Sequence, residues 1–184
     1  MFRRGDRVQY QEVRDANAAW LTPWEGTTPA GPHPKPTFGT LLRTMNAEQE
    51  SGRVFPFAIE YQGNFVGQLT LGNIIRGSYL GAYIGYWIDS RVAGRGIMPT
   101  SVAMAIDFGL TEVGLHRIEI NIRPENAPSL RVVEKLHVPF EGLRPRYLHI
   151  AGDWRDHCCY VADTETMPYG GYLQRWLRES GREQ

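Results

Sequence analysis

The chain has 184 residues, a length that predicts a single domain over 1–184, and its 20 Lys and Arg residues balance 20 Asp and Glu residues. This balance excludes a general attraction to nucleic acid or to an anionic membrane, so we expect no direct nucleic-acid binding. No stretch approaches the roughly 18 apolar residues of a membrane span, and the N-terminal MFRRGDRVQY lacks the apolar core of a signal peptide. We therefore expect a cytoplasmic protein without a membrane partner, and the sequence is compatible with either a monomer or a homodimer.

The two cysteines, Cys158 and Cys159, are adjacent in the sequence. Neighbours on a strand point to opposite faces, which makes them poor disulfide partners, and no other ligands surround them with the spacing of a metal cluster. We interpret them as reduced packing residues and expect no bound metal.

The first third of the chain predicts two helices separated by a long loop. Residues 6–21 have a helical pattern, and residues 22–36 form a loop of Pro, Gly and Thr. From Phe38 to Met45, apolar residues recur at i, i+3, i+4 and i+7, which is one face of a helix. A loop of this length in a compact domain is usually functional or mobile.

The middle of the chain predicts three strands followed by a helix. Residues 54–61 and 65–75 form a hairpin across the turn QGN, and residues 79–88 form a third strand rich in Gly and Tyr. Glycine inside a strand often marks a bulge or a close approach of the backbone. A helical pattern then begins at Met98.

The last part of the chain predicts a strand, a helix, two strands and a final helix. In residues 116–124, isoleucines alternate with Glu119, Asn121 and Arg123, which predicts a strand with one polar face. The later elements are a helix at 127–136, strands at 146–152 and 154–162, and a helix at 170–180. This order indicates an α/β fold, a mixed sheet with helices on both faces.

The segment SRVAGRGIMPTSVA, residues 90–103, joins the third strand to the next helix. Gly94 and Gly96 let the backbone approach a ligand, and amides of the turn and of the helix start can bind an anion with help from the helix dipole. Arg91 and Arg95 add positive charge at the rim. The pattern is neither a Walker motif nor a dinucleotide-binding G-x-G-x-x-G, and alone it is more often simple turn chemistry.

A second strand-to-helix turn follows in NIRPENAPSL, where Asn126 ends the strand and Ser129 opens the helix. An ordinary N-cap at Asn126 is the simpler interpretation of this segment. If strands 79–88 and 116–122 are parallel neighbours, however, the two turns lie side by side, and ligands of such sheets bind in the crevice at the strand ends.

Together these motifs resemble the GCN5-related N-acetyltransferases, which use acetyl-coenzyme A. Residues 91–96, RVAGRG, match the phosphate-binding signature Q/R-x-x-G-x-G/A, and Asn126, Ser129 and the run GDWRDH are similar to ribosomal-protein Nα-acetyltransferases. Within these, PWE at 23–25, the run from Asn121 to Asn126 and WRDH at 154–157 favour the RimJ type, which modifies ribosomal protein S5. The resemblance covers nearly the whole chain. It implies a mostly antiparallel mixed sheet with a splayed central parallel pair.

The sequence departs from this family at four places. The family usually begins with a strand, and here the chain starts almost at the first helix, so that strand is missing or shortened. The family's KLGF reads KLHV at 135–138, Val133 stands where many relatives carry a general-acid tyrosine, and Asn121 stands where some carry a general-base glutamate. The acid and the base must therefore be sought elsewhere.

The resemblance implies that pyrophosphate lies on the amides of residues 92–97 and that the pantetheine arm runs between strands 79–88 and 116–122. A backbone amide at the end of the first of these strands would hold the thioester oxygen. The cofactor-binding residues implied in this way are Tyr86, Trp87, Ile88, Arg91, Val92, Ala93, Gly94, Arg95, Gly96, Ile97, Asn126 and Ser129. Arg131 and Lys135 either meet the 3′-phosphate of coenzyme A or form a solvated helix face.

By the same resemblance the amine attacks directly, so the cysteines are not needed as nucleophiles. A protein α-amine has a pKa near 8, against about 10.4 for lysine, and needs only weak help from a base. Glu25 and Glu119 are the candidate bases, Glu25 being preferred, although most glutamates are simply solvated. Ser129 is the candidate for protonating or hydrogen-bonding the leaving thiolate. The catalytic candidates are Ser129, Glu25 and Asn121, and the substrate-binding candidates are Trp24, Glu25, Trp154 and His157, the last also being readable as a structural histidine.

Three functions are compatible with this pattern. The first is an N-acetyltransferase acting on the N-terminal α-amine of a protein such as ribosomal protein S5. The second is an acetyltransferase for a small-molecule amine, and the third is an acyl-CoA sensor without catalysis. The loop at 22–36 and the last pair of strands would determine the acceptor.

Overall fold

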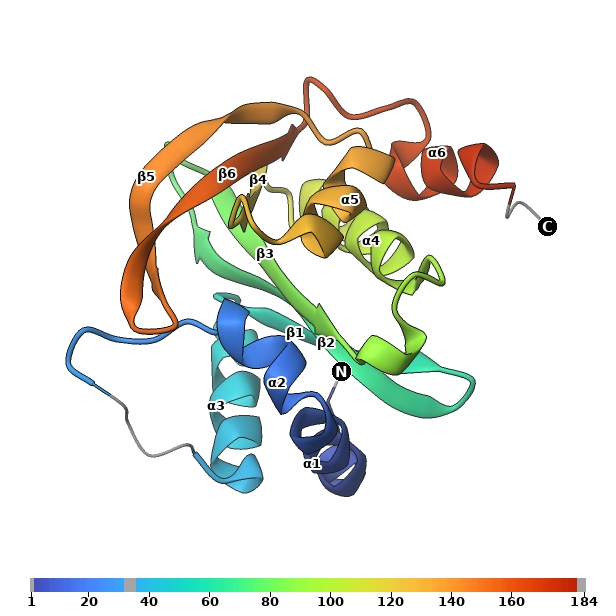
Figure 1. Ribbon diagram of the computed structural model, residues 1–184. Coiled ribbons are helices and arrows are strands. Elements are labelled where there is room, and N and C mark those ends of the chain that lie inside the picture. The colour runs from blue at the N-terminus through green and yellow to red at the C-terminus, as the bar shows by residue number, and fades with distance from the viewer. Residues whose placement is uncertain (1, 32–35, 182–184) are drawn as a thin grey trace.

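The computed structural model describes residues 2–31 and 36–181, so residues 32–35 of the predicted 22–36 loop lie outside the described residues. Its strands form one six-stranded sheet in the order β1-β2-β3-β4-β6-β5 (Figure 1). The elements are η1 Arg4–Asp6, α1 Arg7–Ala16, α2 Ala18–Leu21, η2 Thr22–Trp24, α3 Phe38–Glu50, β1 Phe55–Tyr61, β2 Asn64–Ile75, β3 Gly81–Ile88, η3 Ser90–Val92, α4 Ile97–Thr111, β4 Arg117–Ile122, α5 Ala127–Lys135, β5 Phe140–Ile150, β6 Asp153–Asp163 and α6 Gly171–Glu179.

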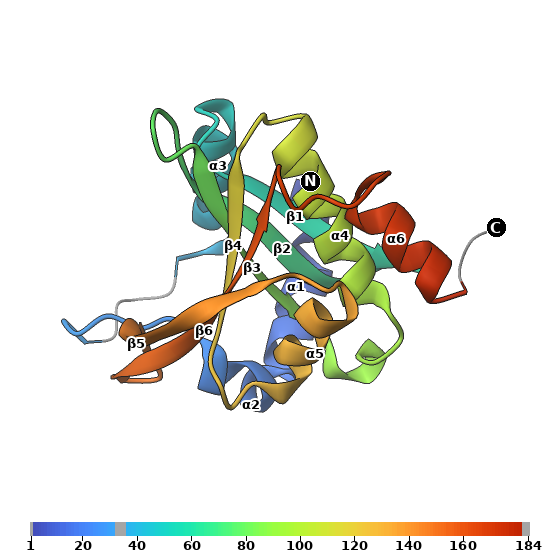
Figure 2. The ribbon, with the colours of Figure 1, turned by 90° about the horizontal axis from the view of Figure 1, so that it is seen from above.

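The sheet has helices on both faces, as the sequence predicts. On one face, α4 is apolar on nearly all sides and packs with the isoleucines of β4 and with Trp176 of α6 in the main core. On the other face, Val13 of α1 and Leu42 of α3 enclose a smaller cluster with Phe65. Figure 2 shows α4 and α6 together on one side of the sheet. In the part of the chain that the structure describes, no helix is long and apolar enough to cross a membrane.

One pair of strands in the sheet is parallel, and its pairing is short. Gly81, Ala82 and Tyr83 of β3 pair with residues 117–119 of β4, while all other neighbouring strands are antiparallel. Beyond Tyr83, β3 stays paired with β2 as far as Ile88, and on its other edge it has no strand partner among residues 2–31 and 36–181. The splayed central pair implied by the family resemblance is therefore present.

The predicted helix over 6–21 is broken at Asn17, whose backbone leaves the helical region. Its side chain is buried, donates to the carbonyl oxygen of Val13 and to Asp89, and accepts from the amide and the hydroxyl of Ser90. The break thus connects α1 and α2 to the turn that leaves β3.

Strand β5 begins at Phe140, six residues before the predicted strand at 146–152. Gly142 and Pro145 conceal the strand in the sequence because both are typical of turns. The pairing with β6 accommodates them through register shifts between Phe140 and Gly142 and between Arg144 and Leu148.

Gly67 of β2 is a site where the fold requires glycine. A Cβ there would lie 2.4 Å from the carbonyl oxygen of Trp87 and 3.1 Å from the Cα of Ile88, both backbone atoms of β3. We expect Gly67→Ala to lower the free energy of unfolding in urea by about 2 kcal/mol or more, because strand backbone cannot yield as a side chain can. Gly85→Ala is the control, since its Cβ would meet only a Tyr83 ring atom at 3.9 Å. Equal losses in the two variants would contradict this account.

Candidate active site

A cavity of about 650 Å³ lies where β3 and β4 diverge. Three parts of the chain line it. They are the segment from α1 to Glu25, the segment from the end of β3 to the first turn of α4, and α5 with the turn before it. The lining residues are Arg14, Trp20, Leu21, Trp24, Glu25, Tyr86, Trp87, Ile88, Val92, Ala93, Gly94, Gly96, Ile97, Met98, Pro99, Asn126, Ala127, Pro128, Ser129, Arg131, Val132 and Lys135. Most of the residues that the sequence assigned to the cofactor are therefore on one surface.

The turn between β3 and α4 presents bare backbone to this cavity. Gly94 and Gly96 have φ angles of +81° and +82°, the left-handed region in which side chains are strained, and a Cβ at Gly94 would meet no atom within 4 Å. Gly96 is the N-cap of α4, so the first amides of this helix face the same space. Such a cradle can bind an anionic group through amide hydrogen bonds and the helix dipole.

Arg91 and Arg95 are placed differently from the rest of the turn. The Arg91 guanidinium lies 2.5 Å from the buried carboxylate of Asp89, which lowers the pKa of that carboxyl group. Both arginines line a second hollow, near Glu12 of α1, and neither lines the main cavity. Their predicted contact with the cofactor stays a prediction.

The start of α5 brings Asn126 and Ser129 to the cavity. The Asn126 side chain caps the helix by accepting from the Ser129 amide at 3.2 Å, which confirms the N-cap interpretation. The Tyr86 hydroxyl donates to the Ser129 carbonyl oxygen at 3.3 Å, and burial raises the pKa of this phenol. The Ser129 hydroxyl itself forms no hydrogen bond with another described residue, so it is free to contact a ligand.

The opposite wall is formed by Trp24 and Glu25, and arginines hold both residues. Glu25 forms an ion pair with Arg14, whose guanidinium lies 5.2 Å from the centre of the Trp87 ring. Arg123, at the end of β4, lies 5.3 Å from the Trp24 ring centre and donates to the carbonyl oxygen of Pro23 at 2.9 Å. The cation–π contacts and the ion pair fix this wall against α1 and β4.

The segment after Glu25 is attached to the turn between β5 and β6. The Thr27 amide donates to the carbonyl oxygen of His149 at 2.9 Å, and the Thr27 hydroxyl contacts His149 Nδ1 at 2.7 Å and the Gly152 amide at 3.0 Å. The Ala151 amide donates to the carbonyl oxygen of Glu25 at 3.2 Å. The two segments predicted to determine the acceptor therefore lie in direct contact.

Comparison with known proteins decides the family. Residues 3–138 match the model of the acetyltransferase (GNAT) domain. The chain belongs to the GNAT acetyltransferase family. It is an N-acetyltransferase that uses acetyl-CoA as donor.

Three relatives illustrate the similarity. The chain is 31% identical to the [ribosomal protein uS5]-alanine N-acetyltransferase of Escherichia coli over 77% of this chain and 74% of that protein. It is 40% identical to the probable N-acetyltransferase YjcK of Bacillus subtilis over 50% of this chain, and it spans about half, 51%, of that relative. The structure of Mycobacterium smegmatis RimJ in complex with CoA-disulfide matches with a TM-score of 0.89 and 36% identity, covering 98% of this chain and 87% of that one.

Two residues predicted to bind the acceptor of this acetyltransferase lie away from the cavity. His157 is buried, its Nδ1 lies 3.0 Å from the carbonyl oxygen of Arg155, and its ring packs edge-on against Tyr147. Burial lowers the pKa of His157, as expected for a structural histidine. Trp154 is 50% exposed and packs its ring edge against His149. Neither residue lines the cavity, so their contact with the acceptor stays a prediction.

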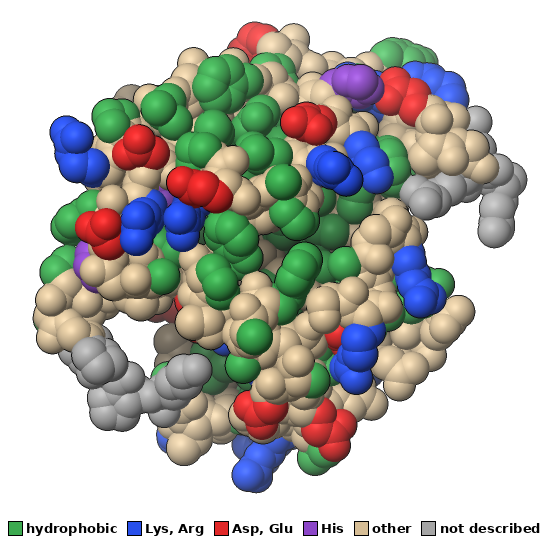
Figure 3. All heavy atoms as spheres, in the orientation of Figure 1, with side chains coloured by type: hydrophobic (Ala, Val, Ile, Leu, Met, Phe, Trp, Pro, Cys, Tyr) green, Lys and Arg blue, Asp and Glu red, His purple; other side chains and the backbone are tan. Residues whose placement is uncertain are grey.

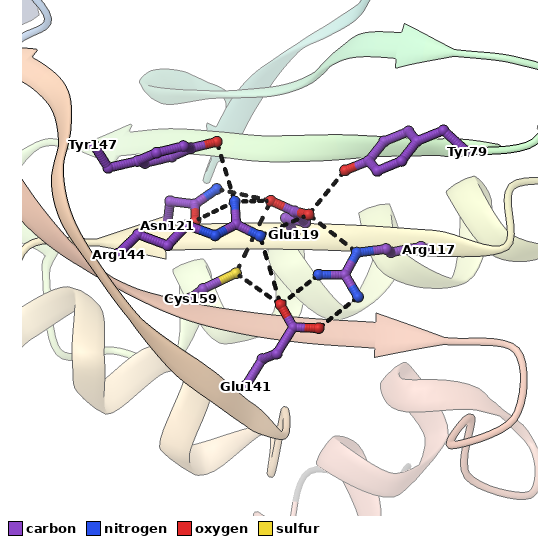
Figure 4. Close-up of polar contacts among 8 residues, drawn as sticks. All are labelled: Tyr79, Arg117, Glu119, Asn121, Glu141, Arg144, Tyr147 and Cys159. Carbon is purple, nitrogen blue, oxygen red and sulfur yellow. Dashed lines mark hydrogen bonds and ion pairs between the residues drawn. The ribbon is translucent and has the colours of Figure 1, made fainter.

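The polar face of β4 carries a hydrogen-bonded network (Figure 4). Glu119, only 5% exposed, is not the solvated carboxylate that glutamates usually are. Arg144 of β5 donates to it at 2.6 and 3.1 Å, Arg117 at 3.0 Å and the Tyr79 hydroxyl at 2.8 Å. Because these donors occupy its oxygens, Glu119 is unsuited to accept a proton from an amine.

Asn121 and Cys159 belong to the same network. The Asn121 side chain donates to Glu119 at 3.4 Å and accepts from Arg144 at 3.5 Å, and it does not line the cavity. Its neutral amide has no basic site, so only a positioning role is open to it. Burial raises the pKa of the Cys159 thiol to about 11, which keeps this cysteine protonated and unreactive. No group of three or more His, Cys, Asp or Glu side chains within 2–31 and 36–181 could hold a metal ion.

The sequence did not point to several residues that build this site. Arg14, Arg144, Tyr147 and Thr27 act through partners that are distant in the sequence, and no local pattern identifies them. Arg123 alone had a signal, since it continues the polar alternation of β4.

The Glu119 network predicts a specific loss of stability in acid. Burial raises the pKa of Glu119, but hydrogen bonds from Arg144, Tyr79 and Arg117 outweigh burial and lower this pKa from 4.5 to about 2. The ionised carboxylate therefore stabilises the fold fully above pH 4.5, and this stabilisation, about 3 kcal/mol, is lost as the pH falls from 4.5 to 2. Urea denaturation at a series of pH values should show this fall in the parent chain and a smaller fall in Glu119→Gln.

The matched control is Glu60→Gln, which removes an exposed glutamate of β1. It should change the free energy of unfolding at pH 7 by less than about 0.5 kcal/mol, whereas Glu119→Gln should lower it by about 3 kcal/mol because Arg117 and Arg144 then share only the half-exposed carboxylate of Glu141. A Glu119→Gln variant as stable as Glu60→Gln would refute the role of the network.

Proposed function

We propose that this GNAT enzyme acetylates the N-terminal α-amine of a protein, as its uS5-acetylating relative is named to do. The supporting observation is that four glutamates described beside the cavity wall and on the polar face of β4 are neutralised by arginines. Glu25, Glu119, Glu125 and Glu141 each form an ion pair with an arginine. Polyamines and aminoglycosides carry several positive charges and need unpaired carboxylates, which this set does not provide.

The same pairing favours an amine that is already neutral. Glu25 is engaged by Arg14 and Glu119 by three donors, so neither is a free base. At pH 7.5 about a quarter of α-amines with a pKa near 8 are neutral, against about one in a thousand lysine amines. An α-amine can therefore attack a thioester with little help, while a lysine side chain cannot.

The residues of the chain divide into a donor side and an acceptor side in this proposal. The amides of residues 92–97 hold the pyrophosphate of acetyl-CoA, which supplies the acetyl group as a thioester. Tyr86, Trp87 and Ile88 offer the unpaired edge of β3 to the pantetheine arm. The Ser129 hydroxyl hydrogen-bonds the departing sulfur, and the proton lost by the attacking amine ends on that sulfur.

On the acceptor side, Trp24 and Glu25 form the wall that the incoming chain end meets. Glu25 keeps one oxygen beyond its ion pair with Arg14, and this oxygen can accept a hydrogen bond from the neutral acceptor amine. Asn121 does not line the cavity and acts indirectly, through its hydrogen bonds to Arg144 and Glu119.

The function is tested by offering acetyl-CoA with peptides that have free Ala, Ser or Met N-termini, with an Nα-blocked lysine peptide and with spermidine. We expect release of free thiol only with the free α-amines, for the electrostatic and pKa reasons above. Faster turnover of spermidine would establish the small-amine alternative. Binding of acetyl-CoA without turnover of any amine would establish the sensor.

The phosphate cradle is tested by Gly94→Asp. A carboxylate side chain at this position projects into open space beside the amides, so it should repel pyrophosphate and abolish acetyl-CoA binding in calorimetry. The fold should persist with a loss of about 1 kcal/mol from the positive φ. Gly52→Asp, also at a positive φ (+68°) in open space, is the control and should bind normally. Unaltered affinity in Gly94→Asp would refute the cradle.

The role of Ser129 is tested by Ser129→Ala. Removing a hydroxyl that contacts only the leaving sulfur should lower kcat about tenfold to a hundredfold and leave the KM for acetyl-CoA nearly unchanged. Steady-state kinetics with the best peptide of the panel measures both quantities. Ser101→Ala, which removes a hydroxyl bonded inside α4, should leave kcat near the parent value. An unchanged kcat in Ser129→Ala would assign this serine to the helix start alone.

A further inference from the structure

The turn between β3 and α4 contains two glycines and needs support from outside itself. Gly94 and Gly96 have positive φ angles, and glycine loses more conformational freedom on folding than any other residue. At its far end the turn runs into α4, where the Gly96 carbonyl oxygen accepts from the amide and the hydroxyl of Thr100 at 3.2 and 2.9 Å. Its near end is only the three-residue helix η3, Ser90–Val92, so a contact from elsewhere must fix that end.

Asn17, 73 residues before Ser90, supplies this contact. Its side-chain oxygen accepts from the amide and the hydroxyl of Ser90 at 2.9 and 2.7 Å, and its nitrogen donates to Asp89 at 3.1 Å and to the carbonyl oxygen of Val13 at 2.9 Å. An asparagine side chain has two donor hydrogens and one oxygen with two lone pairs, so these four bonds use its whole capacity. Neither Asp nor Leu, which have a similar shape, can provide this set.

Asp89 passes the contact on to the turn. Its carboxylate accepts from the Arg91 amide at 3.0 Å and lies 2.5 Å from the Arg91 guanidinium. In Figure 3, hydrophobic side chains fill much of the centre of the face that carries α2 and α5. The polar groups that hold the turn are instead buried, Asn17 being 2% exposed and Asp89 3%. A buried polar group that loses its partner is costly, so this arrangement is strongly specified.

The backbone of Asn17 belongs to the acceptor side of the cavity. The Leu21 amide donates to the Asn17 carbonyl oxygen at 2.9 Å, so α2 starts from this residue. Leu21, Trp24 and Glu25 line the cavity a few residues later, while Asn17 itself does not. Figure 1 shows the junction of α1 and α2 close to the turn that leaves β3. One buried side chain therefore joins the two walls between which acetyl-CoA would lie.

We propose that Asn17 is a positioning residue for acetyl transfer, which acts through Ser90 and Asp89 to keep the turn in the conformation that binds pyrophosphate. The inference rests on the proposed use of this turn as the pyrophosphate site, and it does not depend on the identity of the acceptor. When only a fraction of the molecules has the binding conformation, the apparent Kd rises by the inverse of that fraction. Loss of Asn17 therefore weakens cofactor binding although this residue lies outside the cavity.

Calorimetric titration with coenzyme A, together with steady-state kinetics on the best peptide of the panel, tests the inference. Asn17→Ala should raise the Kd for coenzyme A about tenfold, which corresponds to a turn in the binding conformation about a tenth of the time. The KM for acetyl-CoA should rise by a similar factor. The kcat at saturation should stay within about threefold of the parent value, since Ser129 and the free edge of β3 are untouched.

Two further variants separate the hydrogen bonds of Asn17 from its volume. Asn17→Asp keeps the shape but places a second carboxylate beside Asp89, so it should weaken binding at least as much as Asn17→Ala. Ser90→Ala removes a single hydrogen bond of the set and should raise the Kd about threefold. Parent affinity in a folded Asn17→Asp would overturn the inference. If neither Asn17 variant folds, Ser90→Ala decides alone, and the parent Kd in that variant overturns the inference.

Asp107→Ala is the matched control for lost stability. Asp107 of α4 accepts from the amides of Tyr172 and Leu173 at 2.8 and 2.9 Å, outside the cavity. Its removal should lower the free energy of unfolding in urea and leave the Kd for coenzyme A at the parent value. An equal rise of the Kd in this control would overturn the inference.

The inference and the proposed function fail in different ways. Binding of coenzyme A is measured without an acceptor, so a panel in which no peptide reacts would overturn the proposed function while the titrations still decide the role of Asn17. A parent chain that does not bind coenzyme A would overturn both.

Discussion

The pairing of β3 with β4 over only three residues is the constraint on which this molecule depends. Past Tyr83, β3 continues for five residues paired with β2, and no strand in the described part of the chain pairs with its other edge. Unpaired backbone groups away from water are costly, so this edge needs either solvent or a ligand in the gap. Under the proposed function, the gap between the strands, rather than any single side chain, makes room for the thioester arm.

Tyrosine hydrogen bonds at both ends of the gap connect the β3 segment to β4 and to the start of α5. At the closed end, the Tyr79 hydroxyl reaches Glu119, the last residue of β4 that pairs with β3. At the open end, the Tyr86 hydroxyl reaches the first turn of α5 through the Ser129 carbonyl. Tyr79, just before β3, thus binds β4 directly, and Tyr86, near the end of β3, binds the helix α5 that follows β4.

The ion network at the closed end has a cost as well as a benefit. Burying Glu119 between Arg117 and Arg144 removes three charges from water, and apolar residues of similar size would often be no less stable. The network also favours the correct register between β5 and β6. Arg144 reaches Glu119 in the register observed, which includes the irregularity between Arg144 and Leu148. Because these hydrogen bonds occupy the oxygens of Glu119, this carboxylate is unsuited to act as a base.

The sequence foretold the local geometry of the turns at 94–96 and 126–129 much better than the contacts of Thr27 and Glu119, and the reason is distance along the chain. Gly94, Gly96, Asn126 and Ser129 act through backbone geometry within a few residues of themselves, so a local motif carries the information. Glu119 has partners 40 and 25 residues away, and Thr27 meets a turn more than 120 residues later. Strand alternation correctly assigned Glu119 to the polar face of β4, but only the arrangement of β5 shows that this face is covered there.

The proposed separation of a donor side from an acceptor side suggests which residues could change when the acceptor changes. The donor side is fixed by backbone, so substitutions elsewhere leave it intact. The acceptor side is a wall of tryptophan and glutamate held by Arg14, Arg123 and Thr27, and each of these contacts can change without touching the cradle. Replacing one arginine would release a carboxylate beside the cavity and attract polycations. Under the proposed function, the preference for a neutral α-amine therefore depends on arginines that stand behind the wall of the cavity.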